Sequence, residues 1–261
     1  MTRTTAANPA TWPPPPGTPA TLAEFARALL AAYGPQGWWP LLGHAGSNPT
    51  RSGSGAGYHP GDYSFPHDAR QRFEICAGAI LTQNTAWPNV ERALRNLAAT
   101  GLLAPPAILA AAPERLETAV RPAGYYRAKS RKLQAFSKLW LELDGRPPSR
   151  GQLLATWGVG PETADSMLLY AWGQPELVVD AYTNRVLLHH GFLAAPLPYA
   201  RLKAFCLERL PADVPALQEF HALAVEHAKR LAQATGRLSR ARREPAGAPT
   251  IPAPPGASAC G

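Results

Sequence analysis

The sequence predicts an all-α protein with two helical lobes and a cleft between them. Segments with helical periodicity dominate the 261 residues, and no run alternates apolar and polar residues over several positions, as a half-buried strand would. A glycine-rich turn ending in proline, residues 158–161, separates two of these segments and indicates a helical hairpin. We expect one lobe to run from the early core helix to the hairpin. The other lobe would combine the N-terminal helix with the C-terminal helices.

The N-terminal region contains a leader and a first helix. Residues 1–20 are rich in proline, threonine and alanine, so we expect an extended or disordered leader. Thr21 is a favourable N-cap for an amphipathic helix over residues 22–33.

An aromatic break and a long loop follow. Trp38, Trp39 and Pro40 end the helical pattern, and adjacent tryptophans are as often core residues as site residues. Residues 43–66 are rich in Gly, Ser and His and are too long for an ordinary connection. They form either a mobile surface loop or an insertion near a bound ligand. Arg51 and His59 give no reason to expect a metal site.

The next helix is expected to form the centre of the domain. It would begin after Asp68 as N-cap and run to Gln83, with an apolar face and small residues that allow close packing. Asn84 lies at its exit. Trp87 and Pro88 open another helix, which ends near Ala99.

Two short helices and a long basic helix precede the hairpin. The short helices are expected at 105–111 and 114–120, and a turn at 121–125 leads into a helix over 126–143. That helix carries five cationic side chains: Arg127, Lys129, Arg131, Lys132 and Lys138. They form either a solvated face or contacts with phosphates.

The hairpin is expected to begin with a short helix from Ser149 or Arg150 to Trp157. Gly158 and Gly160 permit a tight turn, and the second helix begins at Pro161. Free amides and the helix dipole at such a turn suit a phosphate. Asp165, on the second helix, is expected to lie on the exposed surface.

A lone carboxylate, Asp180, follows the apolar pair Val178-Val179 and precedes another helix, to His190. Capping that helix is its structural role. Two more helices are expected near 197–210 and 213–234. The histidines of the last helix, His221 and His227, show no metal-ligand spacing, so we expect no metal site.

Composition favours a polyanionic partner. The net charge is +8 and the pI about 9.7, and no spanning segment, lipid anchor or signal peptide is visible. Nucleic acid is therefore a better candidate partner than a membrane. Few, unpatterned cysteines fit a reducing cytoplasm, where the protein would associate with a bacterial nucleoid. Residues 237–261 turn basic and then rich in Pro and Ala, so we expect a disordered tail.

The chain resembles the helix-hairpin-helix superfamily of DNA glycosylases, of which endonuclease III is the type member. Four blocks carry the resemblance, over roughly residues 25–235: 73–85, 158–164, 179–180 and 220–229. The resemblance implies the helix-hairpin-helix glycosylase fold, two lobes around a DNA-binding cleft, for residues 21–236, with the hairpin at 157–163. The implied partner is double-stranded DNA containing damaged bases, bound by a monomer. Gln83, Asn84, Gly158, Gly160 and Thr163 are the expected DNA-binding residues.

Two departures from the family pattern narrow the expected chemistry. Where bifunctional members carry the lysine that forms a Schiff base with the sugar, this chain has Glu162. Many members hold an iron–sulfur cluster on four cysteines, whereas this chain has three, Cys76, Cys206 and Cys260. We therefore expect no cofactor and no strong strand incision.

The Trp38-Trp39-Pro40 motif, with Trp87, resembles the base pocket of the 3-methyladenine branch of this superfamily. That branch can carry a lysine in the late helix, where this chain has Leu223 or Ala224. The resemblance implies base-excision repair of alkylated purines.

In that reading the damaged base leaves the stack and enters a slot lined by tryptophans. Asp180 then stabilises the oxocarbenium-like sugar or orients a water. Gln83 and Asn84 would fill the gap left in the duplex, unless they are merely a polar helix end.

Two alternatives remain open at this point. One is a bifunctional endonuclease III-like glycosylase and AP lyase for oxidised pyrimidines, which would use another lysine such as Lys129 or Lys203. The other is a DNA-binding homologue without catalysis, in which Asp180 serves as a helix cap.

Overall fold

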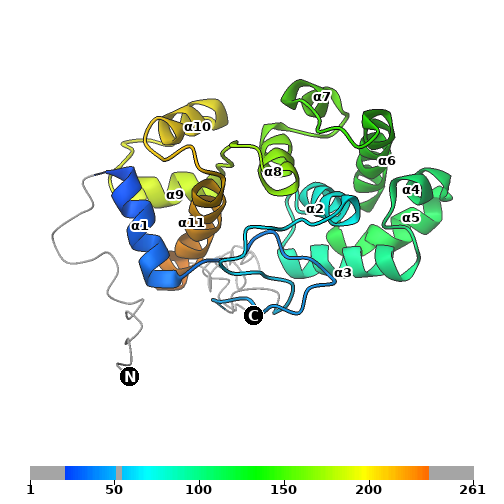
Figure 1. The fold of residues 1–261 in the computed structure, drawn as a ribbon, viewed down its shortest axis with the longest axis horizontal. Helices are drawn as coiled ribbons and strands as arrows, with labels where there is room; N and C mark the ends of the chain where they lie inside the picture. The colour runs from blue at the N-terminus through cyan, green and yellow to red at the C-terminus, as the bar shows by residue number, and fades with distance from the viewer. Residues whose placement is uncertain (1–20, 51–54, 235–261) are drawn as a thin grey trace, which may run out of the picture.

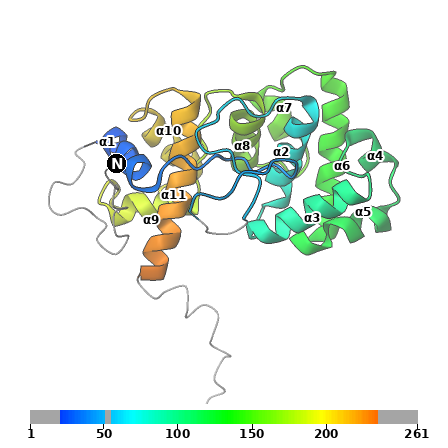
Figure 2. The ribbon, with the colours of Figure 1, turned by 60° about the horizontal axis from the view of Figure 1, so that its bottom comes forward.

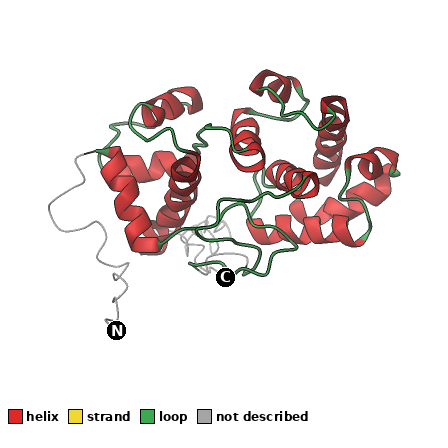
Figure 3. Ribbon diagram, viewed as in Figure 1, coloured by secondary structure: helices red, strands yellow, loops and turns green. Residues whose placement is uncertain are grey.

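A computed structural model describes residues 21–50 and 55–234 of the chain. These residues form eleven α-helices and a single 3-10 turn, η2 (Arg121–Ala123), with one isolated bridge between Ser47 and Ala56 and no strand (Figure 3). The prediction of an all-α protein is confirmed. The helices are Leu22–Tyr33 (α1), Ala69–Leu81 (α2), Trp87–Ala99 (α3), Pro105–Ala110 (α4), Pro113–Val120 (α5), Tyr126–Leu143 (α6), Arg150–Ala155 (α7), Pro161–Trp172 (α8), Ala181–His189 (α9), Tyr199–Leu207 (α10) and Val214–Ala234 (α11).

Local sequence signals explain where several helices begin. Thr21, Ser149 and Asp180 each form a reciprocal capping box, in which the cap side chain and the third helical residue satisfy each other's backbone amides. Asp68 caps α2 as expected, but α2 ends at Leu81 rather than Gln83. The first hairpin helix also ends early, at Ala155 rather than Trp157. The predictions for residues 1–20 and 237–261, and for Arg51 and Cys260, lie outside the described residues.

The helices divide into two lobes (Figure 1). Helices α2 to α8 form one lobe, with α2 packed against α3, α6 and α8, whereas α1 and α9 pack on α11 in the other. Most of α2 is buried, from Phe73 to Leu81, because its small residues let neighbouring helices approach closely. The predicted two-lobed arrangement and the central position of this helix are confirmed.

The segment between α1 and α2 crosses from one lobe to the other (Figure 2). Glu219 on α11 accepts a 2.8 Å hydrogen bond from the amide of Gln36, and Glu74 on α2 accepts one of 2.6 Å from the amide of Leu42. The Trp38–Pro40 motif is therefore held at both ends, with one carboxylate from each lobe.

The described part of the 43–66 loop is built into the fold. His59 is 6% exposed and its ring nitrogens hydrogen-bond the carbonyls of Asp62 and Trp39. His59 therefore ties this part of the loop to the Trp38–Pro40 segment, and the two alternatives, a mobile surface loop or an insertion near a bound ligand, stay predictions.

Candidate active site

The hairpin turn lies between α7 and α8. Gly158 has φ +83°, and a Cβ there would lie 2.4 Å from Cγ of Lys132, so glycine is required for both conformation and space. Gly160 precedes α8 without a side-chain cap, and nothing approaches within 4 Å of where its Cβ would be. The first amides of α8 are consequently open to a ligand, as a phosphate site needs.

Gln83 links the exit of α2 to the hairpin. Its Nε2 donates to the carbonyl of Gly158 at 3.0 Å and to Oγ1 of Thr163 at 2.9 Å, and its Oε1 accepts from Lys132. Thr163 is 7% exposed. In this structure both side chains brace the turn, and their predicted contacts with DNA stay predictions.

An exposed aromatic side chain lies near the Gln83–Thr85 loop. Thr85 Oγ1 donates to the carbonyl of Ala123 at 2.6 Å, which places this loop beside the turn that precedes α6. Tyr125 in that turn is 75% exposed with φ +47°, and Asn84 is exposed with φ +52°. Both therefore project from tight turns on the hairpin's own lobe. The sequence analysis gave Tyr125 no role, although it placed the residue in the turn directly before the basic helix.

Asp180 is half-buried at the start of α9. Its Oδ1 accepts hydrogen bonds from the amide and the hydroxyl of Thr183, at 2.8 and 3.0 Å. Its Oδ2 accepts none from the described residues. One carboxylate oxygen therefore fixes the side chain, and the other can face a reacting group.

The carboxylate of Asp180 acts on three groups from two other helices. On α8, burial first and Asp180 second raise the pKa of Glu162 to about 7. Glu162 itself is exposed, in the first turn of α8. On α11, burial lowers the pKa values of His221 and Lys229, and Asp180 opposes both shifts. Sequence reasoning gave no role to Lys229 or to a Glu162–Asp180 pair.

An aromatic cluster lies beside these groups. Trp39, 6% exposed, contacts Trp38 and Trp87 edge to face, with ring centroids 6.1 and 5.5 Å apart. Trp38 also meets His221 edge to face at 5.3 Å, and His221 hydrogen-bonds Tyr170 at 2.8 Å.

The edge-to-face packing leaves no open slot for a base between the tryptophan rings. Because the rings meet edge to face, no base fits between Trp39 and either neighbour unless a ring moves. Trp38 and Trp87 are half-buried and keep a reachable surface, while Pro40 is buried close to Gly57. The indole Nε1 atoms of Trp39 and Trp87 are buried and have no hydrogen-bond partner among the described residues. Buried donors without partners are uncommon and often mark a functional site.

The predicted surface position of Asp165 is wrong. It was predicted to be a surface residue, yet its side chain is 0% exposed. It accepts hydrogen bonds from Arg150 on α7 (2.7 and 3.2 Å) and from Tyr199 (2.7 Å) and Lys203 (2.8 Å) on α10. The α8 surface that carries Asp165 is covered by α10, whose position the helix pattern alone does not reveal.

The two lysines considered for Schiff-base chemistry are engaged in the fold. Lys129, 2% exposed, donates to the carbonyls of Leu81 and Ala123 and to Thr85 Oγ1, at 2.7, 2.8 and 2.5 Å. Burial lowers its pKa to about 8, with a smaller effect of Lys132. Lys203 is bound to Asp165 and Glu176.

Cys76 and Cys206 are buried free thiols on α2 and α10, and burial raises the pKa of each. In the part of the chain that the structure describes, no group of three or more His, Cys, Asp or Glu side chains is arranged to hold a metal. None of the described helices is long and apolar enough to cross a bilayer.

Comparisons with known proteins agree with this architecture. Residues 77–211 match the HhH-GPD superfamily of base excision DNA repair proteins. MJ1434 of Methanocaldococcus jannaschii, whose name places it among the DNA repair glycosylases, is 36% identical over 215 residues, 78% of this chain and 85% of that protein. Endonuclease III of Thermotoga maritima is 29% identical over 138 residues, 51% of this chain and 64% of that protein.

Solved structures show the same fold. The H. pylori 3-methyladenine DNA glycosylase MagIII, bound to 1,N6-ethenoadenine, superposes with a TM-score of 0.55 at 26% identity, over 61% of this chain and 85% of that one. A non-covalent endonuclease III–DNA complex gives a TM-score of 0.54 at 24% identity, over 59% and 72%.

Proposed function

The chain belongs to the HhH-GPD superfamily of base excision DNA repair proteins, as a DNA repair glycosylase, and from this premise we propose that it removes N-alkylated purines such as 3-methyladenine from double-stranded DNA. We further propose that it acts as a monofunctional hydrolase and as a monomer, without a metal or an iron–sulfur cluster.

The position of Asp180 carries the proposal. Thr183 holds one of its carboxylate oxygens, and the other remains available between the hairpin and the aromatic cluster. As the N-glycosidic bond breaks, the sugar gains positive charge, which an oriented carboxylate stabilises. The same group orients the water that adds to the anomeric carbon. Capping and catalysis therefore do not exclude each other at this residue.

The aromatic cluster supports a cationic base as the substrate. An N-alkylated purine is positively charged, so its contact with a tryptophan face contributes on the order of 1–2 kcal/mol once desolvated. Trp38 and Trp87 offer such faces after a small ring movement, and the unpartnered Nε1 groups of Trp39 and Trp87 offer donors. A base that already carries positive charge leaves readily, so protonation by a general acid is unnecessary.

The lysines support hydrolysis without strand cleavage. The hairpin position where a bifunctional enzyme carries its Schiff-base lysine is Glu162 in this chain. Lys129 is buried, and its ammonium group donates three hydrogen bonds. Lys203 is bound to two carboxylates. The buried Cys76 and Cys206 lie on separate helices, which supports the absence of a cluster.

DNA would be held by the hairpin and by the side chains that project nearby. The α8 amides at Gly160 bind a backbone phosphate. Asn84 and Tyr125, both exposed, enter the duplex where the base has left. Gln83 and Thr163 contribute by fixing the hairpin turn.

Base release from defined duplexes tests this function. One panel carries methylated purines and a second carries oxidised pyrimidines. We expect release from the first, no product trapped by borohydride, and a loss of about 100- to 1,000-fold in Asp180→Asn. Asparagine is also a good N-cap, so this variant should fold and bind duplex normally. Release of oxidised pyrimidines with a trapped adduct would favour the bifunctional alternative. Equal binding without any release in either protein would favour a homologue that has lost catalysis.

A further inference from the structure

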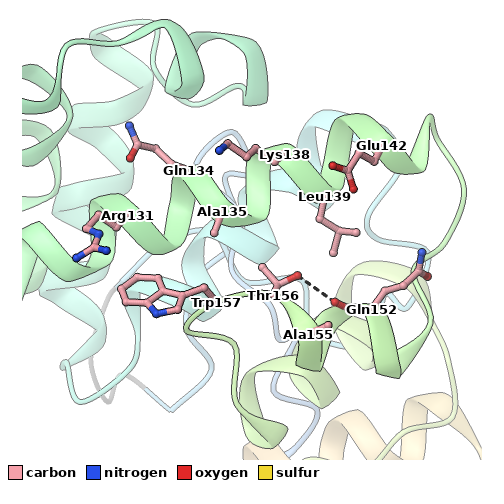
Figure 4. A pocket seen from close by; sticks show the side chains of 10 residues that line it. All are labelled: Arg131, Gln134, Ala135, Lys138, Leu139, Glu142, Gln152, Ala155, Thr156 and Trp157. Atoms are coloured by element: carbon pink, nitrogen blue, oxygen red, sulfur yellow. Dashed lines mark hydrogen bonds between the residues drawn. The ribbon is translucent and has the colours of Figure 1, made fainter.

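A groove of about 570 Å³ runs between α6 and α7 on the outer side of the hairpin (Figure 4). One face of α6 forms its upper wall, with Arg131, Gln134, Lys138 and Glu142 at helical spacing, while Gln152, Thr156 and Trp157 form the opposite wall. Arg131 and Lys138 are exposed, and neither belongs to the candidate active site.

The groove is continuous with the hairpin turn. Trp157, 51% exposed, directly precedes Gly158, and the Arg131 guanidinium lies 4.8 Å from the centre of its ring. Stacking on the indole holds this guanidinium beside the turn while its N–H groups remain free to donate. A hydrogen-bond donor for a phosphate therefore lies at the end of the groove nearest the hairpin.

The chemistry of the lining fits a sugar-phosphate backbone. Arg131 and Lys138 are separated by about 10 Å along α6, equivalent to about three base-pair steps along the duplex axis. The single acidic side chain of the lining, Glu142, lies at the far end from Trp157 (Figure 4). The apolar part of the groove consists of Ala135, Leu139, Ala155 and the Trp157 indole, and the Arg131 guanidinium lies over the indole, which leaves a small area for a protein anchor.

We propose that this groove binds the phosphates of the duplex arm beyond the hairpin, as an extension of the lesion site. The proposal rests on the DNA-binding role proposed above. It adds a site away from the damaged base, which raises affinity without touching the reacting sugar. From Arg131 to Glu142 the groove runs about 16 Å, equivalent to about five base pairs.

The test combines protein variants with a ladder of duplex lengths. In a duplex with one methylated purine, the arm on each side of the lesion is shortened stepwise from about twelve base pairs to about four, and an undamaged duplex of full length serves for comparison. Affinity is measured at several salt concentrations for wild type, for the double variant Arg131→Ser with Lys138→Ser, and for Arg95→Ser. Arg95, 62% exposed on α3 and outside the groove, controls for the loss of a surface cation. Melting temperatures confirm that the variants fold.

We expect the double variant to bind the long duplexes about tenfold less tightly, with a salt slope lower by about 1.8. For duplexes shortened on one particular arm, wild type and double variant should bind equally. Base release at saturating protein should be the same in both. An equal loss of affinity at every length, or no loss, would overturn the proposal, and the second result would instead fit a protein partner. Because duplex binding is measured without base release, a failure of base release leaves this test valid.

Discussion

The buried carboxylate of Asp165 on α8 accepts a 2.8 Å hydrogen bond from the ammonium group of Lys203 on α10. This contact joins the two lobes, because α8 belongs to the lobe of the hairpin and α10 to the lobe of α11. Burial alone would raise the pKa of Asp165, but hydrogen bonds from Arg150, Lys203 and Tyr199 outweigh it and lower the pKa below its usual range. Asp165 therefore stays charged at neutral pH.

Replacing Asp165 with Asn should destabilise the protein by about 3 kcal/mol, since Arg150 and Lys203 lose a buried counter-charge. Urea unfolding at neutral pH measures the effect. Arg209→Ala, which removes an exposed ion pair with Glu208, should cost less than about 1 kcal/mol. Because the folded pKa of Asp165 is lowered, its contribution should disappear as the pH falls below about 4. Equal effects of the two substitutions would contradict a linking role.

Gly78→Ala should impair base release without affecting the binding of undamaged DNA. A Cβ at this position would lie 2.9 Å from Nε1 of Trp39, so the indole must shift against Trp87. Misplacement of a pocket group typically costs on the order of tenfold in rate. Gly43→Ala is the control, because nothing lies within 4 Å of its Cβ position. Unchanged kinetics on a methylated purine would show that Trp39 does not shape the pocket.

Duplex affinity should fall as the pH rises through about 7. Burial and the Asp180 carboxylate hold the pKa of Glu162 near this value, so ionisation places a negative charge in the first turn of α8, beside the expected phosphate. Between pH 6 and 8 we expect a change of about two- to fivefold. Glu162→Gln should remove this dependence, whereas Glu114→Gln in the first turn of α5 should preserve it. A wild-type affinity that is flat with pH would refute the role of Glu162.

The lobe that contains α11 should lose stability in acid. His190 and His227 hydrogen-bond each other at 2.8 Å beneath Phe25 and Tyr33, and burial lowers their pKa values to about 4 and about 3. Nearby charges act as well: His189 on both histidines, and Arg230 on His227.

Unfolding restores ordinary histidine titration, so the unfolded state binds more protons below about pH 6.5. The free energy of unfolding therefore decreases as the pH is lowered. The loss between pH 7 and 5 should be about 1–2 kcal/mol for each histidine. His190→Gln should reduce the loss of unfolding free energy between pH 7 and 5, while His67→Gln, on the surface, should not. The same loss in His190→Gln as in wild type would exclude this histidine pair as the source of the acid sensitivity.

Local signals were sufficient to predict the helices and their grouping. The bounds of α1 and α6 agree with the expected ranges because Thr21 caps the first helix and Gly124 precedes the second by two residues. The hairpin turn was also predictable, since Gly158 adopts the left-handed backbone that the turn requires and Pro161 begins the next helix.

Contacts between distant residues could not be predicted in this way. Asp165 finds its partners 15, 34 and 38 residues away, and Glu219 binds an amide 183 residues away. Such pairs depend on how the helices pack in space, which helical periodicity does not encode. The same limit explains why the edge-to-face contact of Trp39 with Trp87 was missed.

The two carboxylates that hold the Trp38–Pro40 segment have a mechanical consequence. Glu74 and Glu219 belong to different lobes, so a change in the spacing of the lobes pulls on the segment between Gln36 and Leu42. The Trp38 and Trp39 rings lie on this segment, so their edge-to-face contacts depend on the distance between the two lobes.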